Sequence, residues 1–149
     1  MARILIIAHA PLATSLLEVA RHVFPDCGGT LGAVDIPAQL SLEDAQALVC
    51  QALLACGGDE VLILTDVFGA TPCNAALAAA ESARARVVAG VNVPMLWRTL
   101  CYQDKTLEDM VGRAVAGAAQ GVMHVAVPRR QNQAVPTTTH DQVDHHHQQ

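Results

Sequence analysis

The sequence of 149 residues has few aromatic and few charged side chains, 3% and 15% of the chain, whereas 52% of its residues are hydrophobic. This balance excludes a protein that is disordered over most of its length, because such chains have little apolar surface to bury. The core must consist of Val, Ile, Leu and Ala, a mixture that suits buried parallel strands covered by alanine-rich helices. The length predicts one domain.

Basic residues are also few, nine against 14 acidic ones, which gives a net charge of −5. The chain therefore lacks the basic patch that binds nucleic acid. No apolar stretch approaches the ~20 residues of a membrane span. The apolar run Ile4 to Ala8 is shorter than the core of a secretory signal. We expect a cytoplasmic protein with neither nucleic acid nor membrane insertion.

Cysteine motifs are absent as well. The five cysteines are an odd number, and no two have the Cys-x-x-Cys spacing of a redox or zinc motif. No histidine stands at ligand spacing from any of them. This usage predicts small buried thiols in a reducing compartment rather than a disulfide framework or a metal site. The cysteines are Cys27, Cys50, Cys56, Cys73 and Cys101.

Apolar runs alternate with helical patterns along the chain, which predicts repeated strand–helix units on a mainly parallel sheet. Strands are predicted at residues 3–8, 31–35, 60–65, 86–90 and 122–127. Helical spacing and capping residues predict helices at 14–24, 41–55, 73–82, 94–101 and 107–120. The predicted fold class is α/β, an open doubly wound sheet with the flavodoxin-like strand order 2-1-3-4.

The composition changes after Pro128, where Gln, Asn, Thr, Pro and His become dominant. We interpret residues 1–128 as the domain and residues 129–149 as a flexible polar tail. His140 and the run His145 to His147 offer weak ligands for a transition metal, but the composition favours an unstructured end.

Polar residues directly after the predicted strands are the candidates for function, because ligands collect beyond the carboxyl ends of strands where the winding reverses. His9 follows the first strand and Asp66 the third, and the order 2-1-3-4 makes these strands neighbours. A carboxylate that accepts a proton from one imidazole nitrogen leaves the other nitrogen free as a nucleophile or base. Asp35, at the end of the second predicted strand, and Asn92, after the fourth, are further candidates that are also consistent with simple turns.

The loop after the third predicted strand supplies a candidate anion site. Its glycine lets backbone amides approach a ligand closely, and the free N–H groups of the following helix start attract an anion. The candidate phosphate-binding residues are Gly69, Ala70, Thr71, Cys73 and Asn74. An imidazole nucleophile, an orienting carboxylate and an amide cradle together describe phosphoryl transfer through a phosphohistidine.

Three other residues are weaker candidates for chemistry. Cys73, at a predicted helix N-terminus, is a possible thiol nucleophile, although no histidine lies in its own segment. His22 and His124 fit surface or packed positions better than ligand positions.

Four segments, ILIIAHAPLA, GAVDIP, VLILTDVFGATPCNAA and AGVNVPMLWRTL, resemble the enzyme IIA component of the mannose-type sugar phosphotransferase system in order and spacing. The resemblance covers residues 3 to about 127. It implies a homodimeric domain in which His9 takes a phosphoryl group from phosphorylated HPr and passes it on, while Asp66 holds the imidazole. It also implies that residues 122–127 run antiparallel at the sheet edge and take part in the dimer. Such a phosphocarrier needs no metal or organic cofactor.

Two features depart from the family pattern. Ala70 stands where the family motif D-x-x-G-G-[ST]-P has its second glycine, and no linker to a IIB domain is visible. The acceptor is therefore either a IIB component in sugar uptake or a regulatory protein.

Two alternative functions stay open. One is a signalling module whose phosphorylation state at His9 selects a protein partner. The other is the phosphoryl-donating subunit of a dihydroxyacetone kinase. A flavodoxin-like electron carrier is disfavoured, since the chain has no Ser/Thr/Gly-rich loop after the first strand and few aromatic residues to enclose a flavin.

Overall fold

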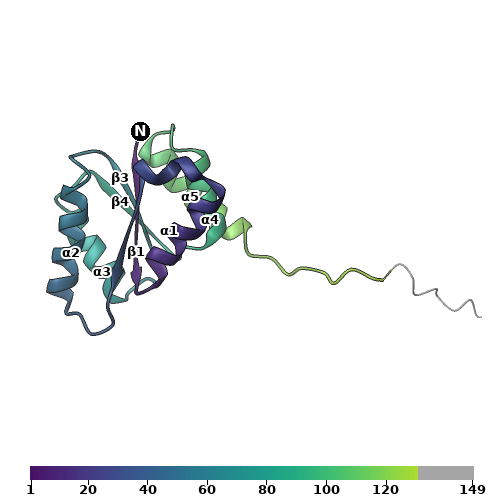
Figure 1. Cartoon of the computed structure of the whole chain (residues 1–149), viewed down its shortest axis with the longest axis horizontal. Helices are drawn as coiled ribbons and strands as arrows, with labels where there is room; N and C mark the ends of the chain where they lie inside the picture. Colours follow the sequence, from purple (N-terminus) through teal and green to yellow (C-terminus); the bar gives the residue numbers. More distant parts are fainter. Residues whose placement is uncertain (131–149) are drawn as a thin grey trace, which may run out of the picture.

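Four apolar segments pair side by side into a parallel sheet with the order β2-β1-β3-β4 (Figure 1). The structure, a computed structural model, describes residues 1–130 of the chain. The strands are β1 (Arg3–His9), β2 (Leu31–Ile36), β3 (Val61–Thr65) and β4 (Ala85–Ala89). The order confirms the predicted one. All of β3 is buried, as its continuous apolar sequence predicts for a strand covered on both faces.

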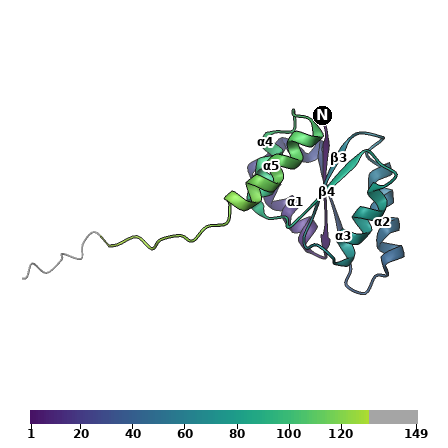
Figure 2. The ribbon, with the colours of Figure 1, turned by 180° about the vertical axis from the view of Figure 1, so that it is seen from behind.

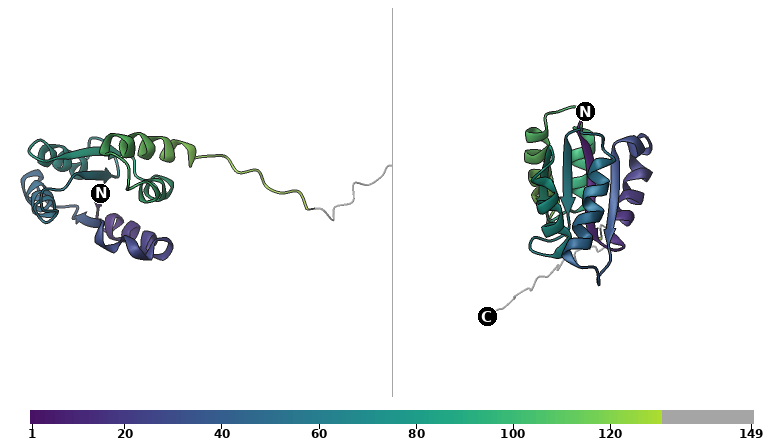
Figure 3. Two further views of the ribbon diagram at one scale, coloured as in Figure 1. Left: turned by 90° about the horizontal axis from the view of Figure 1, so that it is seen from above. Right: turned by 90° about the vertical axis from the view of Figure 1, so that its left-hand side faces the viewer.

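Helices cover both faces of the sheet, so the fold is doubly wound as predicted (Figures 1 and 2). The views from above and from the side show the sheet between the two helix layers (Figure 3). One face carries α1 (Leu12–Val23), α4 (Val93–Cys101) and α5 (Leu107–Gln120), and the other carries α2 (Leu42–Leu54) and α3 (Thr71–Ala80). A short 3₁₀ helix, η1 (Pro25–Gly29), connects α1 to β2.

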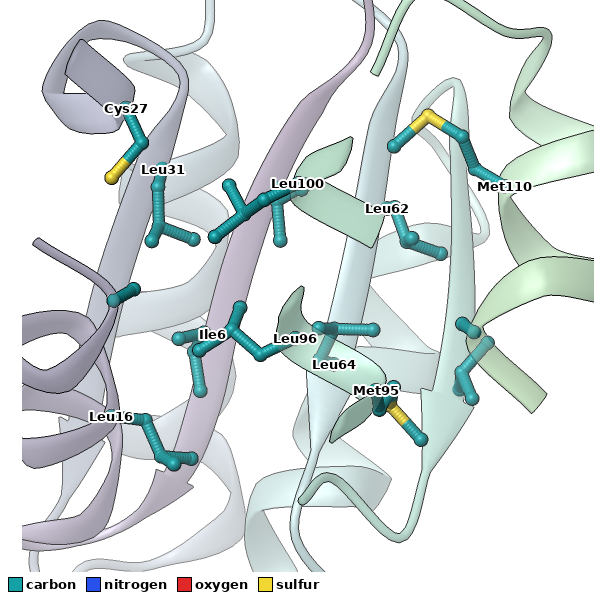
Figure 4. Packing of buried hydrophobic residues seen from close by; sticks show 14 of the residues in the cluster. Ile6, Leu16, Cys27, Leu31, Leu62, Leu64, Met95, Leu96, Leu100 and Met110 are labelled. Carbon is teal, nitrogen blue, oxygen red and sulfur yellow. The ribbon is translucent and has the colours of Figure 1, made fainter. Parts of the chain in front are cut away.

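Alternating side chains of the central strands build one core on each face, as the two-residue period of a strand requires. Ile6 and Leu64 lie on the face covered by α1 and α4, in one cluster with Met95 and Leu96 of α4 (Figure 4). Ile7 and Ile63 belong to the other core, under α2 and α3. Burying each of these large side chains contributes roughly 1.5–3 kcal/mol. The two cores therefore hold the carboxyl ends of β1 and β3 rigidly side by side.

Residues 122–127, predicted as a fifth strand, pair with no strand in the described part of the chain. After α5 the chain leads away from the sheet (Figure 1), and Val122, Met123, Val125 and Val127 are 67–89% exposed. A strand forms only where a neighbour satisfies its backbone groups. The predicted antiparallel edge strand is therefore not present within residues 1–130.

The thiols follow the prediction in part. All five cysteines are free; Cys27, Cys56 and Cys73 are buried, Cys50 is half-buried, and Cys101 is exposed.

Across residues 1–130, no helix combines the length and apolarity that crossing a bilayer demands. His140 and His145 to His147, and most of the predicted tail, lie outside the described residues.

Candidate functional site

The structure brings His9 and Asp66 together at the carboxyl edge of the sheet. His9 is the last residue of β1, Asp66 follows β3, and the two strands are adjacent. The Nδ1 atom of His9 lies 2.6 Å from Oδ2 of Asp66. The winding of the sheet reverses between β1 and β3, so the pair occupies the position where open α/β sheets bind ligands.

Asp66 is held by three N–H donors. The backbone amide of His9 donates to Oδ2 at 2.9 Å, the His9 ring approaches the same oxygen, and the amide of Val67 donates to Oδ1 at 2.8 Å. Burial by itself raises the pKa of this carboxyl group, but the hydrogen bonds from His9 and Val67, and the positive charge of the His9 ring when it is protonated, outweigh burial and lower the pKa below its ordinary value. Asp66 is therefore ionised at neutral pH.

An ionised Asp66 fixes the tautomer of His9. A carboxylate can only accept, so Nδ1 carries the ring proton and donates it, and the lone pair lies on Nε2. The His9 side chain is 46% exposed while that of Asp66 is 12% exposed. The ring is thus anchored on its inner side, and it presents a nucleophilic nitrogen on the outer side.

Because Asp66 is hydrogen-bonded as a carboxylate, part of the free energy of unfolding depends on pH. Since the folded pKa of Asp66 is lowered, its stabilising contribution is complete above the unfolded pKa of about 3.9 and is lost as the pH falls through the folded pKa. We expect Asp66→Asn to flatten the fall in free energy of unfolding over that window. Urea unfolding in small pH steps from neutral to strongly acidic buffer measures it. An identical acid dependence of the wild type and the variant would contradict this assignment.

The loop that follows Asp66 turns back at Gly69, whose φ of +88° favours glycine. The side-chain amide of Asn74 donates to the Gly69 carbonyl at 3.2 Å and closes the loop. Ala70 has a φ of −87°, an ordinary value for any residue. A second glycine is therefore not required by the backbone at this position. Cys73 as a whole residue is 1% exposed, so its thiol is not presented to a ligand.

The N-terminus of α3 differs from those of the other helices. Ser41, Asn92 and Thr106 cap α2, α4 and α5 by accepting a hydrogen bond from a first-turn amide. The first turn of α1 donates to Asp35. The N-cap of α3, Ala70, makes no side-chain cap, and no side chain of residues 1–130 accepts a hydrogen bond from the Thr71 or Cys73 amide. These free donors and the positive end of the helix dipole suit an anion.

The remaining candidates are placed elsewhere. Asn92 has a structural role, because its Oδ1 caps α4 at the Met95 amide (2.9 Å) and its Nδ2 donates to the Ala118 carbonyl (3.2 Å). His22 lies on the exposed side of α1, and His124 lies in the exposed segment after α5. No group of three or more His, Cys, Asp or Glu side chains within residues 1–130 is arranged to hold a metal ion.

Sequence reasoning missed one contact at this edge. Thr14, in the first turn of α1, binds Asp35 of β2 through both its amide and its hydroxyl group. A polar residue early in a helix carries no signal for a partner on a strand that follows later in the chain.

Known proteins resemble this chain both in sequence and in fold. The family described as PTS system fructose IIA component matches residues 3–115. The PTS system fructose-specific EIIA component of Bacillus subtilis (strain 168) is 41% identical over 63 residues, which span 41% of this chain and 43% of that protein. The chain thus matches less than half of that relative's length.

Two solved structures share the fold. The mannose/sorbose-specific IIA subunit of the phosphotransferase system from Enterococcus faecalis superimposes with a TM-score of 0.80 at 22% identity, over 87% of this chain and 98% of that one. Component EIIA from Streptococcus agalactiae gives 0.74 at 21% identity, over 83% and 97%. At these identities the structures support the fold alone, whereas the family match covers more than half of the sequence. The chain belongs to the EIIA-man family, that of the PTS system fructose IIA component.

Proposed function

We propose that the protein is a cytoplasmic phosphocarrier in which Nε2 of His9 accepts a phosphoryl group from phosphorylated HPr and passes it to a second protein. One observation carries the proposal: the ionised carboxylate of Asp66 binds Nδ1 of His9 and leaves Nε2 outward as the nucleophile. The acceptor is a IIB component or a regulatory protein.

The proposed transfer needs no cofactor. The lone pair of Nε2 attacks phosphorus, the bond from phosphorus to the donor breaks, and that electron pair returns to the donor. Nδ1 keeps its proton, so the phosphorylated ring carries positive charge next to the Asp66 carboxylate, which stabilises it. Onward transfer runs the same step in reverse, with the acceptor as nucleophile and Nε2 as leaving group.

The surroundings of His9 suit a phosphoryl group delivered by a protein. The amide of half-buried Thr71, at the start of α3, is a donor for the phosphoryl oxygens. Val67 and Phe68, next to Asp66, are 52% and 79% exposed. Exposed apolar side chains beside a reactive group are typical of a surface that docks another protein.

The direct test is the intact mass of the protein after incubation with phosphoenolpyruvate, enzyme I and HPr. We expect one acid-labile phosphoryl group per chain. If the same HPr phosphorylates a control IIA domain but adds nothing to this protein, the proposed phosphocarrier function is wrong.

We also infer that two copies of the chain form a homodimer through residues 122–127. Apart from His124 this segment is apolar, its large apolar side chains are exposed in the described structure, and β4 is an edge strand with one side unpaired. An antiparallel strand from a second copy would satisfy both.

The dimer predicts a mass in solution twice that of the chain. Val125→Asp in the exposed segment should shift the protein to the monomer, because it places a charge in the buried interface. Sedimentation equilibrium measures this, with Glu18→Gln in α1 as a surface control. A wild-type protein that sediments as a monomer at high concentration would contradict the inference.

A further inference from the structure

The first turn of α1 is hydrogen-bonded to a side chain of β2 and not of β1, the strand that precedes α1. Pro11, the N-cap of α1, provides no side-chain cap. Instead, Oδ1 of Asp35 in β2 accepts from the Thr14 amide at 3.1 Å, and Oδ2 accepts from the Thr14 hydroxyl group. The carboxylate thus replaces the missing cap and neutralises the positive end of the helix. We call this pair the Thr14–Asp35 latch.

The latch lies close to His9 along the chain. Only Ala10 and Pro11 separate His9, at the end of β1, from Leu12, where α1 begins (Figure 1). The Ala10 amide donates to the Ile36 carbonyl of β2 at 3.0 Å, and Asp35 precedes Ile36. The backbone that leaves His9 is therefore tied to β2 at two successive residues, through Ala10 and through α1.

Asp66 ties His9 from the opposite side of β1. Its Oδ2 accepts from the His9 amide and also binds the ring. The backbone of His9 is thus held between β3, through Asp66, and β2, through Ala10 and the latch. Loss of either tie leaves the imidazole free to shift relative to the N-terminus of α3.

We propose that the Thr14–Asp35 latch positions His9 for phosphoryl transfer, with Asp35 as a positioning residue that never touches the phosphoryl group. This inference rests on the proposed function. Because Asp35 already satisfies the first turn of α1, the start of α3, which follows Asp66 along the chain, is left as the open anion site. The latch therefore determines both where the nucleophile stands and which helix receives the phosphoryl oxygens.

The rate of phosphoryl transfer tests the latch. The effect of removing the latch is compared with the effect of removing the N-cap of another helix. A small misplacement of reacting groups costs up to about 10²-fold in rate, so Asp35→Ala should lower the maximal rate of phosphoryl acceptance about 10- to 100-fold. The KM for phosphorylated HPr should stay within about twofold, because the docking surface is intact. Thr14→Ala, which keeps the amide donor, should have a smaller effect. Asp35→Asn, which keeps an acceptor for the Thr14 amide, should recover most of the rate.

Ser41→Ala is the matched control. The Ser41 hydroxyl caps α2 by accepting from the Asp44 amide at 3.1 Å, and α2 carries no residue of the site. We expect a comparable loss of stability with an unchanged transfer rate. If Asp35→Ala and Ser41→Ala lower the transfer rate equally, or if Asp35→Ala keeps the wild-type rate, the latch is only structural and the proposal is overturned.

Amide hydrogen exchange of the unphosphorylated protein gives a second readout that needs no transfer. The His9 and Ala10 amides should exchange at least about tenfold faster in Asp35→Ala and at the wild-type rate in Ser41→Ala. Unchanged exchange in Asp35→Ala would overturn the latch. A wild type that accepts no phosphoryl group would contradict the proposed function, whereas the exchange result would still decide whether the latch holds His9.

Discussion

His9→Ala should abolish phosphoryl acceptance, with the transfer rate lowered by at least about 10³-fold, because the variant lacks the nucleophilic nitrogen altogether. No described neighbour can replace it. Cys73 is buried, and among residues 1–130 His9 is the histidine whose ring is hydrogen-bonded to a carboxylate, that of Asp66. Intact mass after incubation with phosphoenolpyruvate, enzyme I and HPr should show no phosphoryl addition.

His22→Ala is the matched control for this variant. His22 is an exposed histidine on α1 with no carboxylate partner in the described structure, and its removal should leave the phosphoryl addition unchanged. Circular dichroism should show the same helix content in both variants, since His9 is 46% exposed and packs little. An acid-labile phosphoryl group that persists in His9→Ala would place the chemistry on another residue.

The sequence contains enough information to predict the strand order and the central pair of the site. Continuous apolar runs identify buried parallel strands, and the reversal of winding makes the first and third strands neighbours. His9 and Asp66 each follow one of these runs directly, so their proximity is a consequence of topology. α3 starts at Thr71, two residues before the alanine-rich stretch predicted to be helical, and Pro72 lies in its first turn, as the sequence also indicates.

Two features depend on contacts that no local pattern reports. The Thr14–Asp35 latch joins residues 21 positions apart, and neither residue type at its position indicates the other. Residues 122–127 have the composition of a strand, but a strand also requires a neighbour, and the described part of the chain, up to residue 130, places none beside them. Whether Ala70 is compatible with the loop could also not be settled from sequence, since the answer depends on its φ.

Asp66→Asn should slow phosphoryl acceptance by roughly 10²- to 10⁴-fold while leaving the fold intact. The substitution nearly preserves size, so the effect lies in the proton on His9. An ionised Asp66 accepts from Nδ1 and forces the lone pair onto Nε2, whereas an asparagine side chain can turn its NH₂ group toward Nδ1. Nδ1 then becomes the acceptor, and Nε2 carries the proton and cannot attack. The variant also loses the negative charge that stabilises the phosphorylated ring.

Single-turnover transfer from phosphorylated HPr measures the rate, and ¹⁵N chemical shifts of the His9 ring report the tautomer in the same sample. Asp59→Asn is the matched control, because Asp59 is a half-exposed aspartate that is paired with Arg3. This pair lies at the amino-terminal end of the strands, away from His9 and Asp66. Its transfer rate should equal that of the wild type. If Asp66→Asn transfers at the wild-type rate with the proton still on Nδ1, hydrogen bonding without charge is sufficient and the electrostatic role of Asp66 is refuted. If the rate falls and the proton moves to Nε2, the changed tautomer and the lost negative charge together account for the slower transfer, because the substitution leaves the HPr docking surface and the amides of α3 as they are.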